Sequence, residues 1–475
     1  MNKSTPDTKR SIPSDFTLSH DSGQIQESAP LSRISVWCRN HMSDYTYMII
    51  LAIITGIVAG FLAHIFKKMI HAVAYTFIPH IMSSQFNWWI IGVPIVGILL
   101  SGIFTRYILH HSLTHVVAQL INDLKQKSYR LRHDLTFSAI LGGTITLGMG
   151  GSSGAEGPIA ATGAAIGSNI GQLMGLDSNR IKILLACGAS AGIARIFSAP
   201  LGGLMFSLEL LRISLTTLSI LAVTVAALAA YLTSFACNGF QADLFFHPME
   251  GFEWASLPAV IALGIFCGAY SLYYSGVTNY MDKVFKGISN PWRRNITGGV
   301  MLGAILVLFP SMYGVGYPVL TKVIGGDFDA IANGSVLHSA GIASIEGLMV
   351  VAACILACKC WAVSATNSSG GVGGDFAPTL FAGGLAGFLF ASLCNNYLGV
   401  HLPVALFAFY GMAGVMSGVI RTPLMAIFIV IEMSMSYSLS LPVSICALVS
   451  WLTVKGGAIT EAQALPLVKH LNWLR

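Results

Sequence analysis

The chain has 475 residues, of which 54% are hydrophobic and only 10% are charged. An average soluble domain is about 25% charged, so this composition excludes an ordinary cytosolic enzyme and favours a membrane protein. The net charge of +6 is not gathered into a basic run with interleaved aromatic residues. It therefore indicates cytoplasmic loops enriched in Lys and Arg, and no nucleic-acid partner.

The N-terminal segment, residues 1–45, is polar, Ser-rich and mixed in charge. It lacks the short apolar segment of a signal peptide, so we expect a polar cytoplasmic tail. Residues 456–475 should form a second, short tail. Most of the nine cysteines lie in apolar stretches without zinc-ligand spacing, so we predict core residues, no metal site and no cofactor.

Apolar segments fill the chain between these tails. The first, residues 48–66, would cover roughly 28 Å as a helix, close to the hydrocarbon thickness of a bilayer. Further apolar runs follow at about residues 88–104, 135–148, 181–211, 215–235, 256–274, 298–309, 348–358, 380–393, 404–419 and 423–433. Several are short and interrupted by glycine, which indicates broken or re-entrant helices of the kind found in transporters.

The charges of the connecting segments predict the orientation. Basic residues cluster within 106–132 and again within 283–294, whereas residues 239–253 carry three acidic residues and no Lys or Arg. The positive-inside rule places the two basic connections and the N-terminus in the cytoplasm, and residues 239–253 outside. We expect a multi-pass protein of the cell (inner) membrane.

An internal repeat organises the apolar part. Residues 188–211 align without a gap to residues 411–434 at an offset of 223, and SSGAEGP at 152–158 has a looser partner in SSGGVGGDFAP at 368–378. Apolar helices rich in Gly and Ala resemble one another by chance, but two motif pairs at nearly one offset favour duplicated halves. Such halves are often inverted, which places a substrate site at their interface.

The longer pair of repeats matches Glu209 with Glu432. A shared position in both halves favours a shared structural role, such as capping buried backbone, over proton transfer by Glu209.

The Gly-rich breaks in the two halves predict an anion site. Glycines permit a sharp turn, and Pro158 sits where a helix start accepts proline. The unpaired N–H groups and the positive dipole end of each helix would then point into the protein interior. Partial charges of this kind attract an anion without holding it too tightly for transport.

Glu156, in the first break, is a carboxylate at membrane depth and hence a functional candidate. Its negative charge would compete with a bound anion for the same helix N-termini, and protonation would release it. Glu156 would thus be a gate and a proton carrier in one group. The alternative is an inert glutamate that caps its own helix.

Several ordered motifs carry a resemblance to a known family. Residues 154–158, GAEGP, resemble a G-(K/R)-E-G-P motif, residues 374–378, GDFAP, resemble G-x-F-x-P, and residues 433–437 resemble a segment that supplies a pore tyrosine. From about residue 46 to 455 the chain is similar to the CLC family of chloride channels and proton/chloride exchangers, in its bacterial-type form without CBS modules.

The resemblance implies an all-α polytopic membrane fold, a CLC-type inverted repeat of broken and re-entrant helices with halves at about 46–236 and 255–455. It also implies a homodimer in which each subunit has its own pore. Glu156 would be the gating and proton-transferring glutamate. The implied anion-binding groups are the Tyr437 hydroxyl and the backbone N–H groups of Asp375 and Phe376 at a central site, and those of Ala155, Glu156 and Gly157 at an outer site.

Two of the implied positions depart from the family pattern. The loop G-S-G-x-P should fall near residue 112, where the chain reads HSLTH. Ser112 is the best match for its anion-binding serine, although Thr114 is an alternative donor. The inner proton-accepting glutamate expected after Glu209 is Leu210.

Asp375 is a third departure, because a carboxylate beside an anion site would repel the substrate. We expect its side chain to turn away and cap a helix end, leaving only its backbone N–H for the anion.

The resulting prediction is a transporter, and not an enzyme. It would move chloride or a similar small anion across the lipid bilayer, coupled to proton antiport and gated by Glu156. One alternative is a passive voltage- or pH-gated chloride channel, which Leu210 favours. A second is an intramembrane serine protease, because residues 151–154 read GSSG, but the later histidines all lie in loops or at segment ends.

Overall fold

The computed structural model describes residues 38, 41–82, 89–110, 113, 116–125, 129–237, 252–335 and 344–457. This part of the chain is helical, apart from its loops and one isolated backbone bridge. In the first half the helices are α2 (Asp44–Met82), α3 (Trp89–Ile103), η1 (Phe104–Ile108), α4 (Val116–Lys125), α5 (Leu135–Gly148), α6 (Glu156–Leu173), α7 (Ser178–Phe197), α8 (Pro200–Met205), η2 (Phe206–Leu210) and α9 (Thr217–Cys237).

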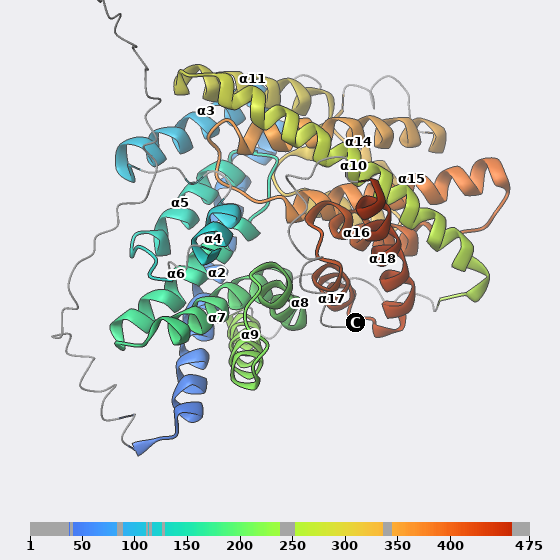
Figure 1. Ribbon diagram of the computed structural model, residues 1–475. Coiled ribbons are helices and arrows are strands. Elements are labelled where there is room, and N and C mark those ends of the chain that lie inside the picture. The colour runs from blue at the N-terminus through green and yellow to red at the C-terminus, as the bar shows by residue number, and fades with distance from the viewer. Residues whose placement is uncertain are drawn as a thin grey trace, which may run out of the picture.

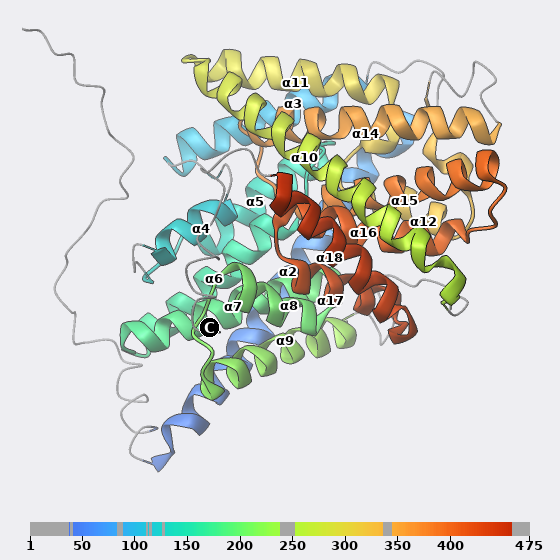
Figure 2. The ribbon, with the colours of Figure 1, turned by 45° about the vertical axis from the view of Figure 1, so that its right-hand side comes forward.

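The second half follows the same plan. Its helices are η3 (Trp254–Ser256), α10 (Leu257–Gly287), α11 (Pro291–Leu308), η4 (Pro310–Met312), α12 (Tyr317–Ile324), η5 (Phe328–Ile331), α14 (Ile345–Asn367), α15 (Phe376–Leu398), α16 (Val404–Ile420), α17 (Pro423–Ser434), η6 (Tyr437–Leu439) and α18 (Ser440–Gly457). Figures 1 and 2 show the blue and green helices of the first half beside the orange and red helices of the second, with α3 and α11 running together.

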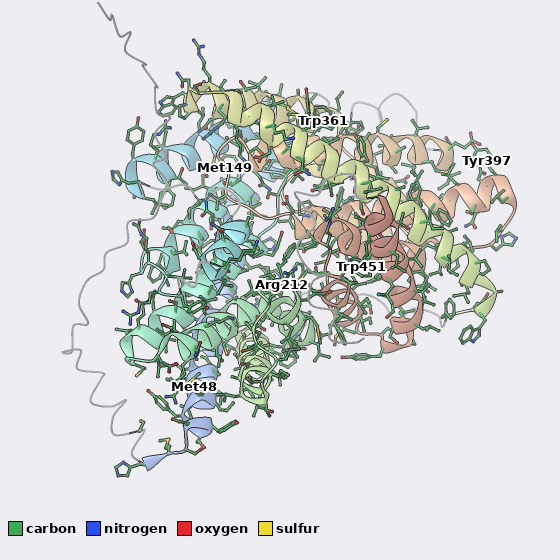
Figure 3. All side chains as sticks on the ribbon, in the orientation of Figure 1. Met48, Met149, Arg212, Trp361, Tyr397 and Trp451 are labelled. Carbon is green, nitrogen blue, oxygen red and sulfur yellow. The ribbon has the colours of Figure 1, made fainter. Side chains whose placement is uncertain are left out.

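Seven helical segments within the described residues are long and apolar enough to cross a membrane. They are Asp44–Phe77, Trp89–Ile108, Thr217–Cys237, Trp254–Gly287, Ile345–Asn367, Phe376–Leu398 and Tyr437–Lys455. Shorter apolar helices accompany them, among them Pro200–Leu210 and Pro423–Ser434. The predicted mixture of spanning and broken helices is confirmed. Large apolar side chains also cover the outside, as Figure 3 shows for Tyr397, which is 67% exposed.

The backbone repeats where α7 and α16 end. Ser198 and Arg421, 223 positions apart, both adopt the left-handed conformation, with φ/ψ of 55°/36° and 63°/32°. Ala199 and Thr422 follow with φ/ψ of −128°/85° and −127°/79°. A proline then begins the next helix, α8 or α17, in each half. The apolar run over residues 181–211 is therefore two helices joined by a sharp corner, and its counterpart in the second half turns the same way.

Glycine contacts repeat in the same manner. A Cβ atom at Gly163 of α6 would collide with the carbonyl oxygen of Gly188 in α7, and one at Gly383 of α15 would collide with that of Gly411 in α16. Each helix pair thus packs backbone against backbone at equivalent positions. The two halves therefore repeat one helical plan, as the sequence predicted.

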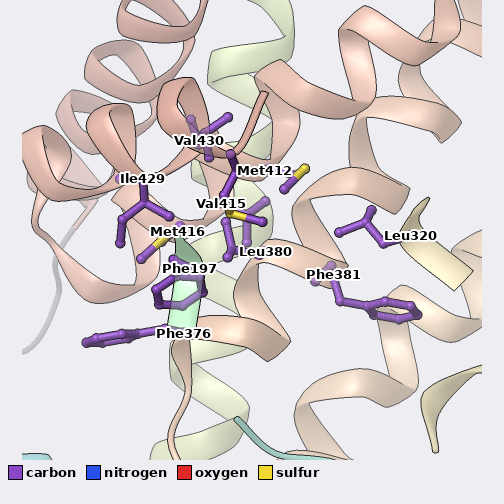
Figure 4. Packing of buried hydrophobic residues seen from close by; sticks show 14 of the residues in the cluster. Phe197, Leu320, Phe376, Leu380, Phe381, Met412, Val415, Met416, Ile429 and Val430 are labelled. Carbon is purple, nitrogen blue, oxygen red and sulfur yellow. The ribbon is translucent and has the colours of Figure 1, made fainter. Parts of the chain in front are cut away.

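The hydrophobic core joins the two halves. Figure 4 shows Phe197, the last residue of α7, among Phe376, Met416 and Ile429 of α15, α16 and α17. All four side chains belong to one buried cluster. The contact fixes the end of α7 against the start of α15, which is where the second Gly-rich loop enters its helix.

Candidate functional site

The two Gly-rich loops meet and pair in an antiparallel bridge. The N–H of Gly154 donates to the carbonyl of Gly374 at 2.9 Å, and the N–H of Gly374 donates back at 2.8 Å. Gly154 lies two residues before α6, and Gly374 lies two residues before α15. A Cβ at Gly157 would lie 3.1 Å from the carbonyl oxygen of Gly373, so the loops approach closely because glycine is present. The bridge brings two helix N-termini to one place.

A hydroxyl and an amide reinforce this bridge. Ser153 Oγ donates to Asn367 Oδ1 at 2.6 Å and to the carbonyl of Gly374 at 2.9 Å. Asn367 is the last residue of α14 and its Nδ2 donates to Asp375 Oδ1 at 3.1 Å. The chain of bonds from Ser153 through Asn367 to Asp375 ties the loop of the first half to that of the second.

The carboxylate of Glu156, in the first half, lies against the N-terminus of helix α15 in the second half. Its Oε1 accepts hydrogen bonds from the backbone N–H groups of Phe376 at 2.7 Å and Ala377 at 3.3 Å. The side chain is 1% exposed. Glu156 therefore does not act as the inert cap of its own helix, α6. Its carboxylate is bound instead by backbone N–H groups of α15, which carry partial positive charge.

The expectation for Asp375 requires a correction. Asp375 occupies the N-cap position of α15, but its side chain makes no capping hydrogen bond. Its carboxylate instead accepts from Asn367, and Glu156 takes the N–H groups that the cap would have used. The side chain thus turns away from these N–H groups, as expected, because a second-half amide binds it.

Ala155, Gly157 and Phe376 lie in the same centre. Ala155 is the N-cap of α6 and is buried, and Gly157 lies against Gly373 and Gly374. The buried ring of Phe376 packs edge-on against Phe206, with the ring centroids 6.0 Å apart. Ala155, Gly157 and Phe376 therefore lie in or beside the two joined loops.

Tyr437 is the first residue of the one-turn helix η6. Its side chain is 63% exposed. The helix α17 ends at Ser434, and the left-handed residue Met435 turns the chain before η6 begins. Ser112 and Thr114 lie outside the described residues, whereas Leu113 between them is buried in a cluster with Val372.

The structure adds a group that the motifs did not identify. Lys359 of α14 is fully buried, and its Nζ donates to Ser152 Oγ at 2.9 Å and lies 4.6 Å from the centroid of the Phe381 ring. Ser152 Oγ donates in turn to the carbonyl of Met312 at 2.9 Å. An amine thus supports the loop that carries Glu156. A single Lys within an apolar run was the available sequence signal.

The cysteines around this lysine show no metal centre. Cys354 and Cys358 are half-buried, Cys360 is buried, and within the described residues no group of three His, Cys, Asp or Glu side chains could hold a metal ion.

Glu209 and Glu432 take the structural role predicted from their pairing. Glu432 accepts from the N–H groups of Leu201 at 3.0 Å and Gly202 at 2.8 Å, in the first turn of α8. Glu209 accepts from Met425 N–H at 2.9 Å in the first turn of α17. Each glutamate caps a helix of the other half, so the capping prediction is confirmed.

Comparisons with known proteins agree with this architecture. A family model described as "Voltage gated chloride channel" matches residues 96–455. A putative chloride channel protein ClcB-like of Ralstonia nicotianae is 26% identical over 398 residues, which are 81% of this chain and 86% of the relative. The H(+)/Cl(-) exchange transporter ClcA of Vibrio cholerae is 26% identical over 434 residues, which are 88% of this chain and 86% of that protein.

Solved structures show the same fold. A slow cyanobacterial Cl-/H+ antiporter superposes with a TM-score of 0.75 at 22% identity, covering 88% of this chain and 96% of that one. A CLC-type fluoride/proton antiporter gives a TM-score of 0.70 at 21% identity, covering 87% and 97%. With three quarters of its length matched by the family model and its two loops joined as described above, the chain belongs to the CLC family.

Proposed function

We propose that this protein moves chloride or a similar small anion across the membrane in exchange for protons. The observation that carries the proposal is the Glu156 carboxylate on the backbone N–H groups of Phe376 and Ala377. A carboxylate oxygen on these donors stands where a small anion would bind. The similarity to a protein named as an H(+)/Cl(-) exchange transporter supports chloride and proton as the pair.

The exchange follows from competition for these donors. An ionised Glu156 and an anion both carry negative charge, so they exclude each other from the α15 N-terminus. Protonation of Glu156 removes its charge and weakens its hydrogen bonds to the N–H groups of Phe376 and Ala377. The anion then binds these N–H groups instead. Loss of that proton on the other side of the site lets the carboxylate return. One group thereby gates the anion and carries the proton.

Neighbouring groups complete the proposed path. The N–H groups of Ala155 and Gly157 supply an outer anion position, those of Asp375 and Phe376 a central one, and Ser112 a hydroxyl donor. The side chain of Asp375 accepts a hydrogen bond from Asn367 and does not cap α15. Partial charges at each position let the anion leave again.

A passive chloride channel is the second candidate, and one observation favours it. The Glu209 carboxylate is bound to the N–H groups of α17, and the next residue, Leu210, cannot carry a proton. In an exchanger, water would have to bring protons to Glu156 past this position.

The membrane setting is part of the proposal. We infer a homodimer in the cell (inner) membrane with the N-terminal tail in the cytoplasm, because the basic connections of the sequence favour that orientation. The serine protease alternative is less well supported, since both hydrogen bonds of Ser153 Oγ go to Asn367 and Gly374.

Liposomes that contain the purified protein test the proposal. With a chloride gradient directed outward, chloride efflux and external pH are recorded together for the wild type and Glu156→Ala. The matched control is Glu346→Ala, which removes an exposed carboxylate at the start of α14. Proton uptake that follows chloride in the wild type and the control but not in Glu156→Ala establishes an exchanger.

Two other outcomes change the assignment. Chloride efflux without proton movement in the wild type establishes the channel. Absence of chloride flux at every pH overturns chloride as the substrate, and the same assay is then repeated with nitrate, bromide and fluoride.

A further inference from the structure

Two buried thiols lie close together in the second half of the chain. Cys267 belongs to α10 and Cys446 to α18, and both are fully buried, free cysteines. A Cβ atom at Gly414 of α16 would lie 2.9 Å from Cys446 Sγ and 3.0 Å from Cys267 Sγ. The two sulfur atoms therefore flank one point, beside a helix position that carries no side chain.

Close helix packing fixes this pair of thiols. The helices α10, α16 and α18 run close together (Figure 2). A Cβ atom at Gly264 of α10 would collide with Val449 of α18. Cys267 Sγ lies 3.9 Å from the carbonyl oxygen of Gly411, which is the oxygen that faces Gly383 of α15. Rigid spanning helices thus hold both sulfur atoms, and such support preorganises a pair of ligands.

The number of ligands and their charge decide which metal ion fits. Zinc prefers four ligands, and the described residues hold no group of three His, Cys, Asp or Glu side chains for it. Soft cations prefer sulfur ligands, and thiols bind them after losing their protons. A divalent ion with two thiolates is neutral, whereas a monovalent ion would leave a net negative charge in an apolar core, which is unfavourable. The pair therefore favours a soft divalent ion.

We propose that Cys267 and Cys446 form a binding site for a soft divalent cation of the mercury(II) type. The ion forms one bond to each sulfur atom, and the two thiol protons leave to solvent, so the step needs no oxidant. Because both thiols are buried, the ion enters only when the helices open locally, and binding should be slow. The bound ion ties α10 to α18, which lie far apart in the chain, and this tie should stabilise the fold.

Mercury retention by the purified protein tests this site. The background protein carries Cys354→Ala, because Cys354 and Cys358 lie about one turn apart on α14 and could form another pair. It is incubated with mercury(II) chloride and dialysed against an excess of a monothiol, which removes ions that a single sulfur holds. We expect about one mercury ion per chain to remain, with two sulfur neighbours in X-ray absorption.

Single substitutions distinguish a two-sulfur site from scattered thiols. Cys267→Ala and Cys446→Ala should each lose the retained ion, and the double variant should lose no more than either alone. The matched control is Cys187→Ala, which removes a fully buried thiol of α7 and should keep the ion. Thermal unfolding without mercury shows that each variant is folded, and one folded single variant is sufficient. No retained ion in the background protein, or retention after Cys446→Ala, would overturn the proposal.

The melting temperature of the dialysed protein is a second readout. Bound mercury should raise it in the background protein and leave it unchanged in Cys267→Ala. An equal rise in both would place the ion at other thiols and would also overturn the proposal. Chloride flux does not enter these measurements, so their outcome is independent of the proposed anion transport.

Discussion

Glu209 and Glu432 cap each other's helices: each carboxylate binds N–H groups at the start of the short helix that leads to the other glutamate. Glu432 at the end of α17 binds the N–H groups at the start of α8, and Glu209, just after α8, binds those at the start of α17. The two short helices α8 and α17 are thereby locked together in opposite directions. Positions that repeat along the chain at an offset of 223 thus face each other in space.

Removing this lock should destabilise the protein. Glu432→Ala leaves the N–H groups of Leu201 and Gly202 without their acceptor, and we expect a loss of about 1–3 kcal/mol in the free energy of unfolding. Glu209→Ala should have a smaller effect, because Glu209 is the more exposed of the two. The measurement is thermal unfolding in detergent, with Glu346→Ala as the control. Equal melting temperatures for all three variants would contradict the capping role.

The pH dependence of flux tests the gate. Chloride flux through the wild type should rise as pH falls, because protonation neutralises Glu156 and frees the N–H groups of Phe376 and Ala377. Glu156→Gln is neutral at every pH, so its flux should be independent of pH and uncoupled from protons. The assay is chloride efflux from liposomes between pH 4 and 8, approximately the range in which carboxyl groups titrate in proteins. A variant that kept the pH dependence of the wild type would place the gate elsewhere.

Asp375→Asn should leave chloride flux within about twofold of the wild type, since the amide keeps the oxygen that accepts from Asn367. Asp375→Ala should reduce flux further, because Asn367 also holds Ser153 and would lose its second anchor. Initial rates of chloride efflux at saturating chloride compare the two variants. A large increase in flux for Asp375→Asn would show instead that the carboxylate faces the anion and repels it.

Lys359 offers a test of the electrostatics behind the first loop. Lys359→Met removes the amine that binds Ser152 but keeps a long side chain over Phe381, and we expect at least about threefold slower chloride flux. Lys455→Met is the matched control, since Lys455 lies over the Trp451 ring at the exposed end of α18. Equal rates for both variants would make Lys359 a packing residue only.

The protease alternative has a direct test. A fluorophosphonate probe should leave the protein unlabelled, because Ser153 Oγ donates to Asn367 and to a backbone carbonyl. Labelling that disappears in Ser153→Ala would establish a nucleophile and overturn the transport assignment as the sole function.

Local chemistry explains why much of the fold could be predicted. An apolar run indicates burial in lipid regardless of which helices pack against it. Glycine and proline determine turns through the backbone conformation of only a few residues. The offset of 223 predicted that residues 188–211 and 411–434 share one structure, and the chain indeed turns alike at Ser198 and Arg421. The Gly-rich breaks predicted turns that lead into helices, which are α6 and α15. Even the shared role of Glu209 and Glu432 followed from their equivalent positions.

Contacts between distant segments were decided by the tertiary structure. Glu156 and Phe376 are 220 residues apart, so no local pattern indicates that one half would supply the carboxylate and the other half the N–H groups. The burial of Lys359 against Ser152 depends in the same way on which helices meet. The sequence by itself determined the helices, their breaks and the preference for an anion, since these depend on residues close together in the chain. Which donors and carboxylates share one site depends on packing between the halves, and only the folded chain decides it.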